Sequence, residues 1–107
     1  MAVEYFNNQT PASNTAVQMI AVSATHDFFT SVVCVNKGRG DAKVTVYGAS
    51  AGATEAQIMY YCKEQIVPGN TTFETKKLTI TGTKALFAKS DNGNVAFASV
   101  GLKTIRI

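Results

Sequence analysis

One stretch of the sequence, residues 28–47, constrains the fold more than any other because it contains two β-rich arms around a sharp reversal. Both arms, residues 28–36 and 42–47, are rich in Val and Thr, whose branched side chains favour a pleated sheet. The residues between them include Gly38 and Gly40, and glycine accepts the positive φ angles that a tight turn requires. The stretch therefore predicts a β-hairpin at the centre of a small β domain.

The two arms of this predicted hairpin differ in the arrangement of their apolar residues. In residues 28–36 both faces are apolar, whereas in residues 42–47 Ala42, Val44 and Val46 alternate with more polar side chains. An alternating strand buries one face and leaves the other in water, and a strand that is apolar on both faces is normally covered twice. We therefore expect residues 28–36 to be covered on both faces and residues 42–47 on one.

Short extended segments of the same kind follow along the rest of the chain, separated by residues that favour turns. Pro68-Gly69 is typical of a reversal, and Asn92-Gly93 is the preferred pair of a two-residue hairpin turn. The other predicted strands are residues 15–23, 58–62, 71–75, 78–80, 84–89, 95–100 and 103–107, with a bend at Gly101. The pattern predicts an all-β, single-domain β-sandwich of jelly-roll or immunoglobulin-like type, with about seven to eight short antiparallel strands.

Length and composition indicate one folded unit that devotes much of its surface to contacts. A chain of 107 residues is one domain. Only 16% of its residues are charged, which is low for a monomer that faces water on all sides. Residues 1–14 are mostly polar and rich in turn formers, so we expect an N-terminal arm that orders against a neighbour, with the sandwich at residues 15–107.

Several functional classes are disfavoured by the sequence. The 10 basic residues form no block, which argues against a nucleic-acid partner, and no apolar run has the length of a membrane span. The start of the chain lacks the basic and apolar regions of a signal peptide. We expect Cys34 and Cys62 to be reduced, buried thiols, and a Cys34–Cys62 bridge across the sandwich is the alternative.

No group of residues has the pattern of a catalytic, cofactor or metal site. The single histidine, His26, lies beside Asp27 in a predicted turn, and the chain has no nucleophile motif. His26 and the two cysteines lack the close pairing of zinc ligands, and the acidic residues do not follow the pattern of a calcium loop. We therefore expect no enzyme, no cofactor and no metal ion.

Loops, termini and aromatic residues are the candidates for binding. Arg39-Gly40-Asp41 resembles an integrin-binding tripeptide, but Gly and Asp are also what a tight turn selects. Tyr47, Tyr60, Tyr61 and Phe73 would suit a platform that stacks sugars or bases, and equally a protein interface or the core. We also expect the small-residue loop 48–54 to be a contact. The residues that we predict to contact partners are Tyr5, Phe6, Asn7, Asn8, Lys37, Arg39, Asp41, Tyr60 and Tyr61.

The order of motifs in residues 15–101 is distinctive. It runs through Val33-Cys34-Val35-Asn36, a glycine-containing turn, Ala42-Lys43-Val44-Thr45-Val46-Tyr47, an aromatic strand, Ile66-Val67-Pro68-Gly69-Asn70-Thr71, Leu78-Thr79-Ile80 and residues 95–101. This order resembles the small β-sandwich structural proteins of tailed-bacteriophage virions. The chain departs from that pattern at Gly82-Thr83, where the family has Gly-Asp.

The resemblance implies a non-enzymatic virion component. The role that we expect first is a capsid decoration (cement) protein, which stabilises the head shell by packing on neighbouring subunits. An accessory protein of the neck or tail is the alternative within this class, and a receptor- or glycan-binding module is the alternative from another class. The implied partners are the major capsid protein or other virion proteins, with the chain as a homo-oligomer or in many copies. The implied location is the virion, after synthesis in the host cytoplasm, with no membrane or nucleic-acid partner.

Overall fold

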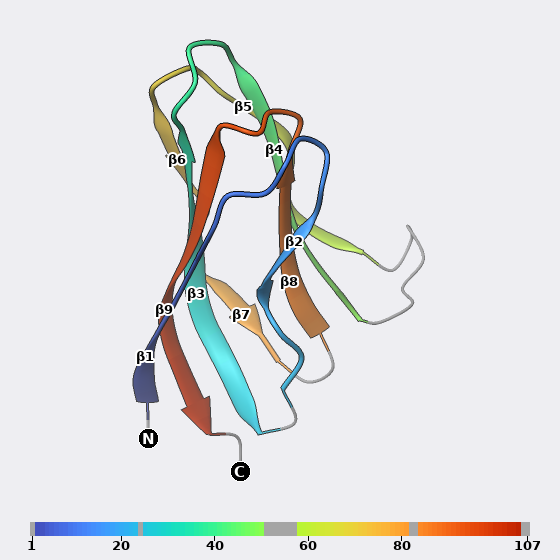
Figure 1. Cartoon of the computed structure of the whole chain (residues 1–107). Coiled ribbons are helices and arrows are strands. Elements are labelled where there is room, and N and C mark those ends of the chain that lie inside the picture. The colour runs from blue at the N-terminus through green and yellow to red at the C-terminus, as the bar shows by residue number, and fades with distance from the viewer. Residues whose placement is uncertain (1, 24, 51–57, 82–83, 106–107) are drawn as a thin grey trace.

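Two antiparallel β-sheets packed face to face form the domain (Figure 1). The computed structural model describes residues 2–23, 25–50, 58–81 and 84–105. Within these ranges no helix is present that could cross a membrane. The strands in these ranges are β1 (Ala2–Gln9), β2 (Val17–Ile20), β3 (His26–Asn36), β4 (Ala42–Ser50), β5 (Met59–Val67), β6 (Thr72–Glu74), β7 (Leu78–Ile80), β8 (Lys84–Ser90) and β9 (Val95–Ile105). The predicted all-β sandwich is confirmed.

The order of strands in the two sheets identifies the topology. In the five-stranded sheet the order is β1-β9-β3, with β6 and β7 paired along the other edge of β3. In the four-stranded sheet the order is β2-β8-β4-β5. Consecutive strands therefore alternate between the sheets, except at β4–β5 and β6–β7. This alternation is the jelly-roll arrangement, which decides between the two sandwich types that the sequence left open.

The predicted hairpin of residues 28–47 is wrong because its two arms belong to different sheets. β3 pairs with β9, β6 and β7, whereas β4 pairs with β5 and β8. Residues 37–41 form a corner between the sheets, and neither Gly38 nor Gly40 has a φ angle in the left-handed region. Asn92-Gly93 lies in a corner of the same kind, between β8 and β9, so the predicted hairpin turn is also wrong there.

Left-handed backbone occurs instead at Asn14, Glu64 and Asn70, with φ angles of 57°, 52° and 59°. Asparagine tolerates this conformation better than most residues, so Glu64 is the exception among the three. The Asn70 N–H donates to the Gly38 carbonyl at 3.0 Å, which fastens the turn at residues 68–70 to the β3–β4 corner. Gly69 is required beside it for space, because a Cβ there would overlap the Arg39 carbonyl.

A buried asparagine closes this end of the sandwich. Asn36, at the end of β3, is fully buried, and its Nδ2 donates to the carbonyls of Gly40 at 2.8 Å and Val67 at 2.9 Å. Its Oδ1 accepts the Gly38 N–H at 3.0 Å. Each of these bonds satisfies a polar group that would otherwise cost free energy on burial. The side chain therefore holds the corner in place of a paired turn.

The hydrophobic core lies between the two sheets. Its fully buried side chains include Val32, Cys34 and Phe97 from the five-stranded sheet and Val44, Val46 and Leu86 from the four-stranded sheet. Burial of each larger apolar side chain contributes about 1.5–3 kcal/mol to folding. The core therefore depends on the inward-facing half of each strand, as alternation predicts for β4.

Only one face of β3 is covered, contrary to the expectation for residues 28–36. Phe28, Val32 and Cys34 point into the core. The other face carries Phe29, which is 40% exposed, and Val33, which is half-buried. No described strand lies over this face, because β3 belongs to an outer layer of a two-layer sandwich.

The N-terminal residues are part of the sandwich. β1 pairs with β9 along its whole length, from Ala2 opposite Thr104 to Gln9 opposite Phe97. The prediction that residues 1–14 are an arm that orders only against a neighbour is therefore corrected for residues 2–9, whose partners lie in the same chain. Along β1, Glu4, Phe6 and Asn8 are exposed on one face, and Tyr5, Asn7 and Gln9 are half-buried on the other.

Strands β3 and β9 are both longer than the sequence predicted. β3 begins at His26, where a turn was expected, and β9 continues through Gly101, where a bend was expected. Gly101 has a different role. A Cβ at this position would overlap the Phe29 carbonyl oxygen and come within 2.7 Å of the Thr30 Cα, so glycine permits the close approach of β3.

We predict that Gly101→Ala destabilises the protein by about 1–3 kcal/mol, because the added methyl group must push β3 and β9 apart. Gly40→Ala is the matched control, since nothing lies within 4 Å of the added Cβ and φ is not left-handed. The control should be neutral or stabilise by up to about 1 kcal/mol. Urea unfolding measures both, and equal free energies of unfolding for the two variants would contradict the role of Gly101.

Candidate functional site

The structure does not bring the predicted partner residues together in one site. On β1, Tyr5 and Asn7 point inward, and both donate a hydrogen bond to the Met19 carbonyl, at 2.7 and 3.0 Å. Tyr5 also packs edge-on against Phe28, with ring centroids 5.0 Å apart. These two residues therefore join β1 to the core and to β2. Phe6 points outward and is exposed, and Asn8, two residues on, is also exposed.

Three other predicted contacts, Lys37, Arg39 and Asp41, lie in the corner between β3 and β4. All three are exposed, while the backbone of the corner is fixed, with the Lys37 N–H donating to the Asn94 carbonyl at 3.0 Å. Arg39-Gly40-Asp41 is thus displayed at one end of the sandwich and not at a hairpin tip. Of the predicted loop 48–54, residues 48–50 belong to β4 and residues 51–54 lie outside the described residues.

The two remaining candidates, Tyr60 and Tyr61, point to opposite sides of β5. Tyr61 packs against the core cluster, as does Phe73 of β6. Tyr60 lies on the outer face of the four-stranded sheet beside Tyr47. Of the four aromatic residues proposed for a stacking platform, the structure therefore brings together only Tyr47 and Tyr60.

An apolar patch occupies the outer face of the five-stranded sheet. In register, Phe6 of β1 lies opposite Val100 of β9, and Leu102 of β9 lies opposite Phe29 of β3. The exposed fractions of these four side chains lie between 40% and 66%. We call these four residues the outer apolar face. Because their strands are hydrogen-bonded neighbours, the four side chains form one contiguous surface and are not exposed singly.

Carboxylates flank the outer apolar face. Glu4 lies opposite Leu102 in the β1–β9 register. Glu74, opposite Val33 on β6, accepts a hydrogen bond from the Ser31 hydroxyl at 2.9 Å. Lys77 lines the same hollow as Glu4, Phe6 and Leu102, so the apolar centre has a margin of mixed charge.

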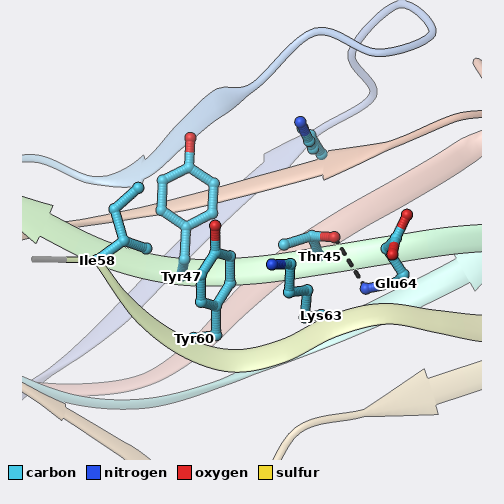
Figure 2. A pocket seen from close by; sticks show the side chains of 7 residues that line it. Thr45, Tyr47, Ile58, Tyr60, Lys63 and Glu64 are labelled. Atoms are coloured by element: carbon cyan, nitrogen blue, oxygen red, sulfur yellow. Dashed lines mark hydrogen bonds between the residues drawn. The ribbon is translucent and has the colours of Figure 1, made fainter. Parts of the chain in front are cut away.

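The outer face of the four-stranded sheet has different chemistry. Tyr47 of β4 stacks on Phe87 of β8, with centroids 5.3 Å apart and planes 19° apart, and packs against Tyr60 of β5 at 6.0 Å. The Lys63 Nζ lies 4.7 Å from the centroid of the Tyr60 ring. Figure 2 shows Tyr47 and Tyr60 side by side, with Thr45, Lys63 and Glu64 further along the same two strands. Burial raises the pKa of the Tyr47 hydroxyl, so this side chain stays neutral at physiological pH.

A β-bulge in β5 shapes this face. Val44 and Val46 of β4 lie opposite Gln65 and Cys62 of β5, so that Thr45 faces two residues of β5 instead of one. The extra residue is accommodated by the left-handed φ of Glu64, whose N–H donates to the Thr45 Oγ1 at 3.0 Å.

Two hollows adjoin on this face. The first, of about 220 Å³, is lined by residues that include Tyr47, Tyr60 and Lys63, and the second, of about 210 Å³, by residues that include Asn14 and Asp91. Thr45, Glu64 and Lys89 line both hollows. The two hollows are therefore neighbours, and together we call them the tyrosine groove.

Both cysteines are free thiols. Cys34 is fully buried in β3, and Cys62 is half-buried in β5, with its Sγ 3.8 Å from the Val44 carbonyl oxygen. Burial, and to a smaller extent the neighbouring Cys62, raises the pKa of the Cys34 thiol to about 12. Burial likewise raises the pKa of Cys62. Both thiols are therefore protonated and poorly nucleophilic at neutral pH.

The described residues contain no cluster of three or more His, Cys, Asp or Glu side chains that could hold a metal ion. A hollow of about 640 Å³ lies between β5 and β6 and is lined by residues such as Tyr61, Cys62 and Phe73. Its thiol is protonated, so it supplies no activated nucleophile.

Comparison with known proteins supports the fold. No protein-family model and no curated protein sequence matches this chain. Among solved structures, the crystal structure of PirA is similar with a TM-score of 0.52 and 16% identity, over 92% of this chain and 93% of that one. Infectious bursal disease virus structures of the Gx and Gt strains give TM-scores of 0.46 and 0.40, with 8% and 11% identity. They match 98% and 96% of this chain but only 31% and 28% of the viral chains. The PirA likeness shows a shared sandwich fold.

Sequence reasoning missed most of the residues on the two outer faces. Phe6 and Tyr60 were predicted contacts, but Phe29, Val100 and Leu102 were not. The signal for Phe29 was present as an apolar residue on the second face of residues 28–36, which was expected from the sequence to be covered by another layer. The pairing of Phe87 with Tyr47 depends on strand order and had no signal in the sequence.

We predict that the free energy of unfolding falls as the pH rises from 8 to 10. The unfolded chain releases the Cys34 proton near pH 9, whereas the folded chain holds it to about pH 12. The contribution of Cys34 to the free energy of unfolding is therefore fully present below pH 9 and decreases above it. At pH 10 about 1 kcal/mol of this contribution is lost. Urea unfolding at both pH values should show a shallower fall for Cys34→Ala than for the wild type, and identical falls would contradict the assignment.

Proposed function

We infer that this chain is a non-enzymatic structural subunit of a virus particle that attaches to other particle proteins through its outer apolar face. The observation that carries this proposal is the exposure of Phe6, Phe29, Val100 and Leu102 as one contiguous surface. The more specific form of the proposal is a capsid decoration protein on the head of a tailed phage, and it rests on the sequence resemblance. The jelly roll itself does not decide the function, because this fold serves many.

The energetics of the outer apolar face support a docking role. A contiguous exposed apolar surface on a soluble protein usually marks an interaction site. Full burial of a Phe or Leu side chain contributes about 1.5–3 kcal/mol, so burial of the four residues would offset a substantial part of the cost of association. The low content of charged residues, 16%, fits a subunit that is covered by neighbours on one side.

The shape and margin of the face indicate what kind of partner fits. The side chains lie on three hydrogen-bonded strands, so the surface is broad and held by the backbone ladder. Phe6, Val100 and Leu102 also line an open hollow of about 520 Å³ on this surface. Such a surface suits a second protein surface better than a small molecule. Glu4, Glu74 and Lys77 at the margin favour a partner with an apolar centre and charged residues of both signs around it.

The direct test is the variant Phe6→Ser/Leu102→Ser in particles of the virus that encodes the chain. Both side chains are exposed in the isolated domain, so the variant should fold, with unfolding changed by about 1 kcal/mol or less. We expect its occupancy on purified particles to fall at least about tenfold, because it loses two buried apolar contacts. Quantitative mass spectrometry against the major shell protein measures occupancy.

Ile66→Ser is the matched control for this variant. Ile66 is 52% exposed and lies opposite Lys43 on β4, in the four-stranded sheet. Its loss should leave occupancy unchanged. Equal occupancy of the double variant and the wild type would overturn the docking role of the outer apolar face.

The copy number of the wild-type chain tests the position on the particle. A ratio to the major shell protein near one, or a simple fraction of it, is the result expected for a decoration protein. A few copies to a few dozen per particle would support the neck or tail alternative. Absence of the chain from purified particles would overturn the virion proposal.

A further inference from the structure

We propose that the tyrosine groove, on the outer face of the four-stranded sheet, is a binding site for a neutral oligosaccharide of at least two sugar rings. The groove combines the aromatic side chains Tyr47 and Tyr60 at one end with polar side chains at the other. This proposal is independent of the docking role of the outer apolar face, which belongs to the other sheet.

The aromatic end of the groove provides flat apolar surface in a fixed position. Phe87, Tyr47 and Tyr60 come from the neighbouring strands β8, β4 and β5, and Tyr47 is the register partner of both other rings. The stack of Tyr47 on Phe87 fixes the Tyr47 ring before any ligand arrives. The C–H face of a pyranose ring is apolar and packs on such aromatic surfaces, while its hydroxyl groups stay free for hydrogen bonds.

The polar part of the groove offers both hydrogen-bond donors and acceptors. Lys89 and Lys43 supply ammonium donors, and Glu64 and Asp91 supply carboxylate acceptors. The Thr45 hydroxyl accepts the Glu64 N–H, and a hydroxyl group can also donate one hydrogen bond. Sugar hydroxyl groups donate and accept at once, so they match a surface of mixed charge.

The balance of charge disfavours a nucleic acid or a phosphate in this groove. Phosphate groups are bound where basic side chains are in clear excess. Here the carboxylates of Glu64 and Asp91 lie among the lysines and would repel an anion. A neutral polyhydroxylated ligand is not repelled by these carboxylates.

The backbone of Glu64 is a second, independent observation. A left-handed φ of 52° at a residue that is not Gly or Asn is strained. The bulge that requires it places both Lys63 and Glu64 on the lining of the groove, where regular alternation would place only one of them. Strain of this kind tends to persist where it positions a functional side chain.

The size of the groove sets the length of the ligand. Each hollow, at about 220 and 210 Å³, is small for a ligand site, for which about 300–1,000 Å³ is usual. The two hollows taken together fall within that range. One sugar ring at Tyr47 and Tyr60 and a second near Asn14 and Asp91 would use both hollows, so a disaccharide should bind more tightly than a monosaccharide.

A glycan array probed with the wild-type protein identifies the sugar, and saturation-transfer NMR with the corresponding free disaccharide measures the affinity. We expect binding in the millimolar range and a loss of about tenfold for Tyr60→Ala, since one ring contact is removed. Phe6→Ala is the matched control, because it removes an exposed aromatic side chain from the other sheet and should leave sugar binding unchanged.

Glu64→Gly separates a functional from a structural role of the strained residue. Glycine relieves the left-handed strain, so the urea midpoint should rise, while sugar binding should weaken at least about fivefold because a carboxylate acceptor is lost. A variant that is more stable and binds equally well would contradict the role of Glu64.

Three outcomes would overturn the proposal. They are the absence of any neutral glycan ligand on the array, sugar binding that Tyr60→Ala leaves unchanged, and salt-sensitive binding of oligothymidylate that Tyr60→Ala abolishes. The last result would assign the groove to single-stranded nucleic acid. None of them bears on particle occupancy, which the Phe6→Ser/Leu102→Ser variant tests separately.

Discussion

The pairing of β3 with β9 is the interaction on which the other strands of the five-stranded sheet depend. It runs over 11 residues of each strand, from His26 opposite Ile105 to Asn36 opposite Val95. β1 then adds to the free edge of β9, and β6 and β7 add to the free edge of β3. The close approach at Gly101 belongs to this pairing, so the glycine is a requirement of the strand pair and not of a turn. A slip of one residue in this register would exchange the buried and exposed faces of both strands.

The sequence predicts where the strands lie far better than it predicts how they pair. Val-rich and Thr-rich segments and turn residues are local signals, and the segments that they predict are strands in the structure. The sheet to which each strand belongs is set by contacts between distant residues, and the corners at residues 37–41 and 91–94 contain the same residue types as hairpin turns. In the same way, an apolar second face on β3 signals burial without saying whether the cover comes from this chain or from a partner. The predicted contacts Phe6 and Tyr60 lie on the outer faces. Phe29 comes to lie beside Leu102, and Phe87 beside Tyr47, only through the order of the strands.

The two outer faces of the sandwich are chemically distinct. The outer apolar face is made of aliphatic and phenylalanine side chains, whereas the tyrosine groove combines phenol rings with lysines and carboxylates. The core between the sheets separates them, so occupation of one face does not obstruct the other. A subunit built in this way can be held on a surface by one sheet and present the other sheet to solvent. Because the two faces lie on different sheets, the docking of one face and the binding of a ligand at the other do not depend on each other.

The alternation of strands between the sheets also has a consequence for how the chain folds. Nearly all of the sheet pairings join residues that are far apart in sequence, with Ala2 opposite Thr104 as the extreme case. Such topologies fold slowly, typically in milliseconds to seconds, because long loops must close before the contacts that stabilise them can form. During synthesis β1 and β3 must wait for β9, the last strand described, before the five-stranded sheet exists. Phe6 and Phe29 therefore reach their places beside Val100 and Leu102 only after the ribosome has made nearly all of the described residues. The outer apolar face cannot form on a shorter nascent chain.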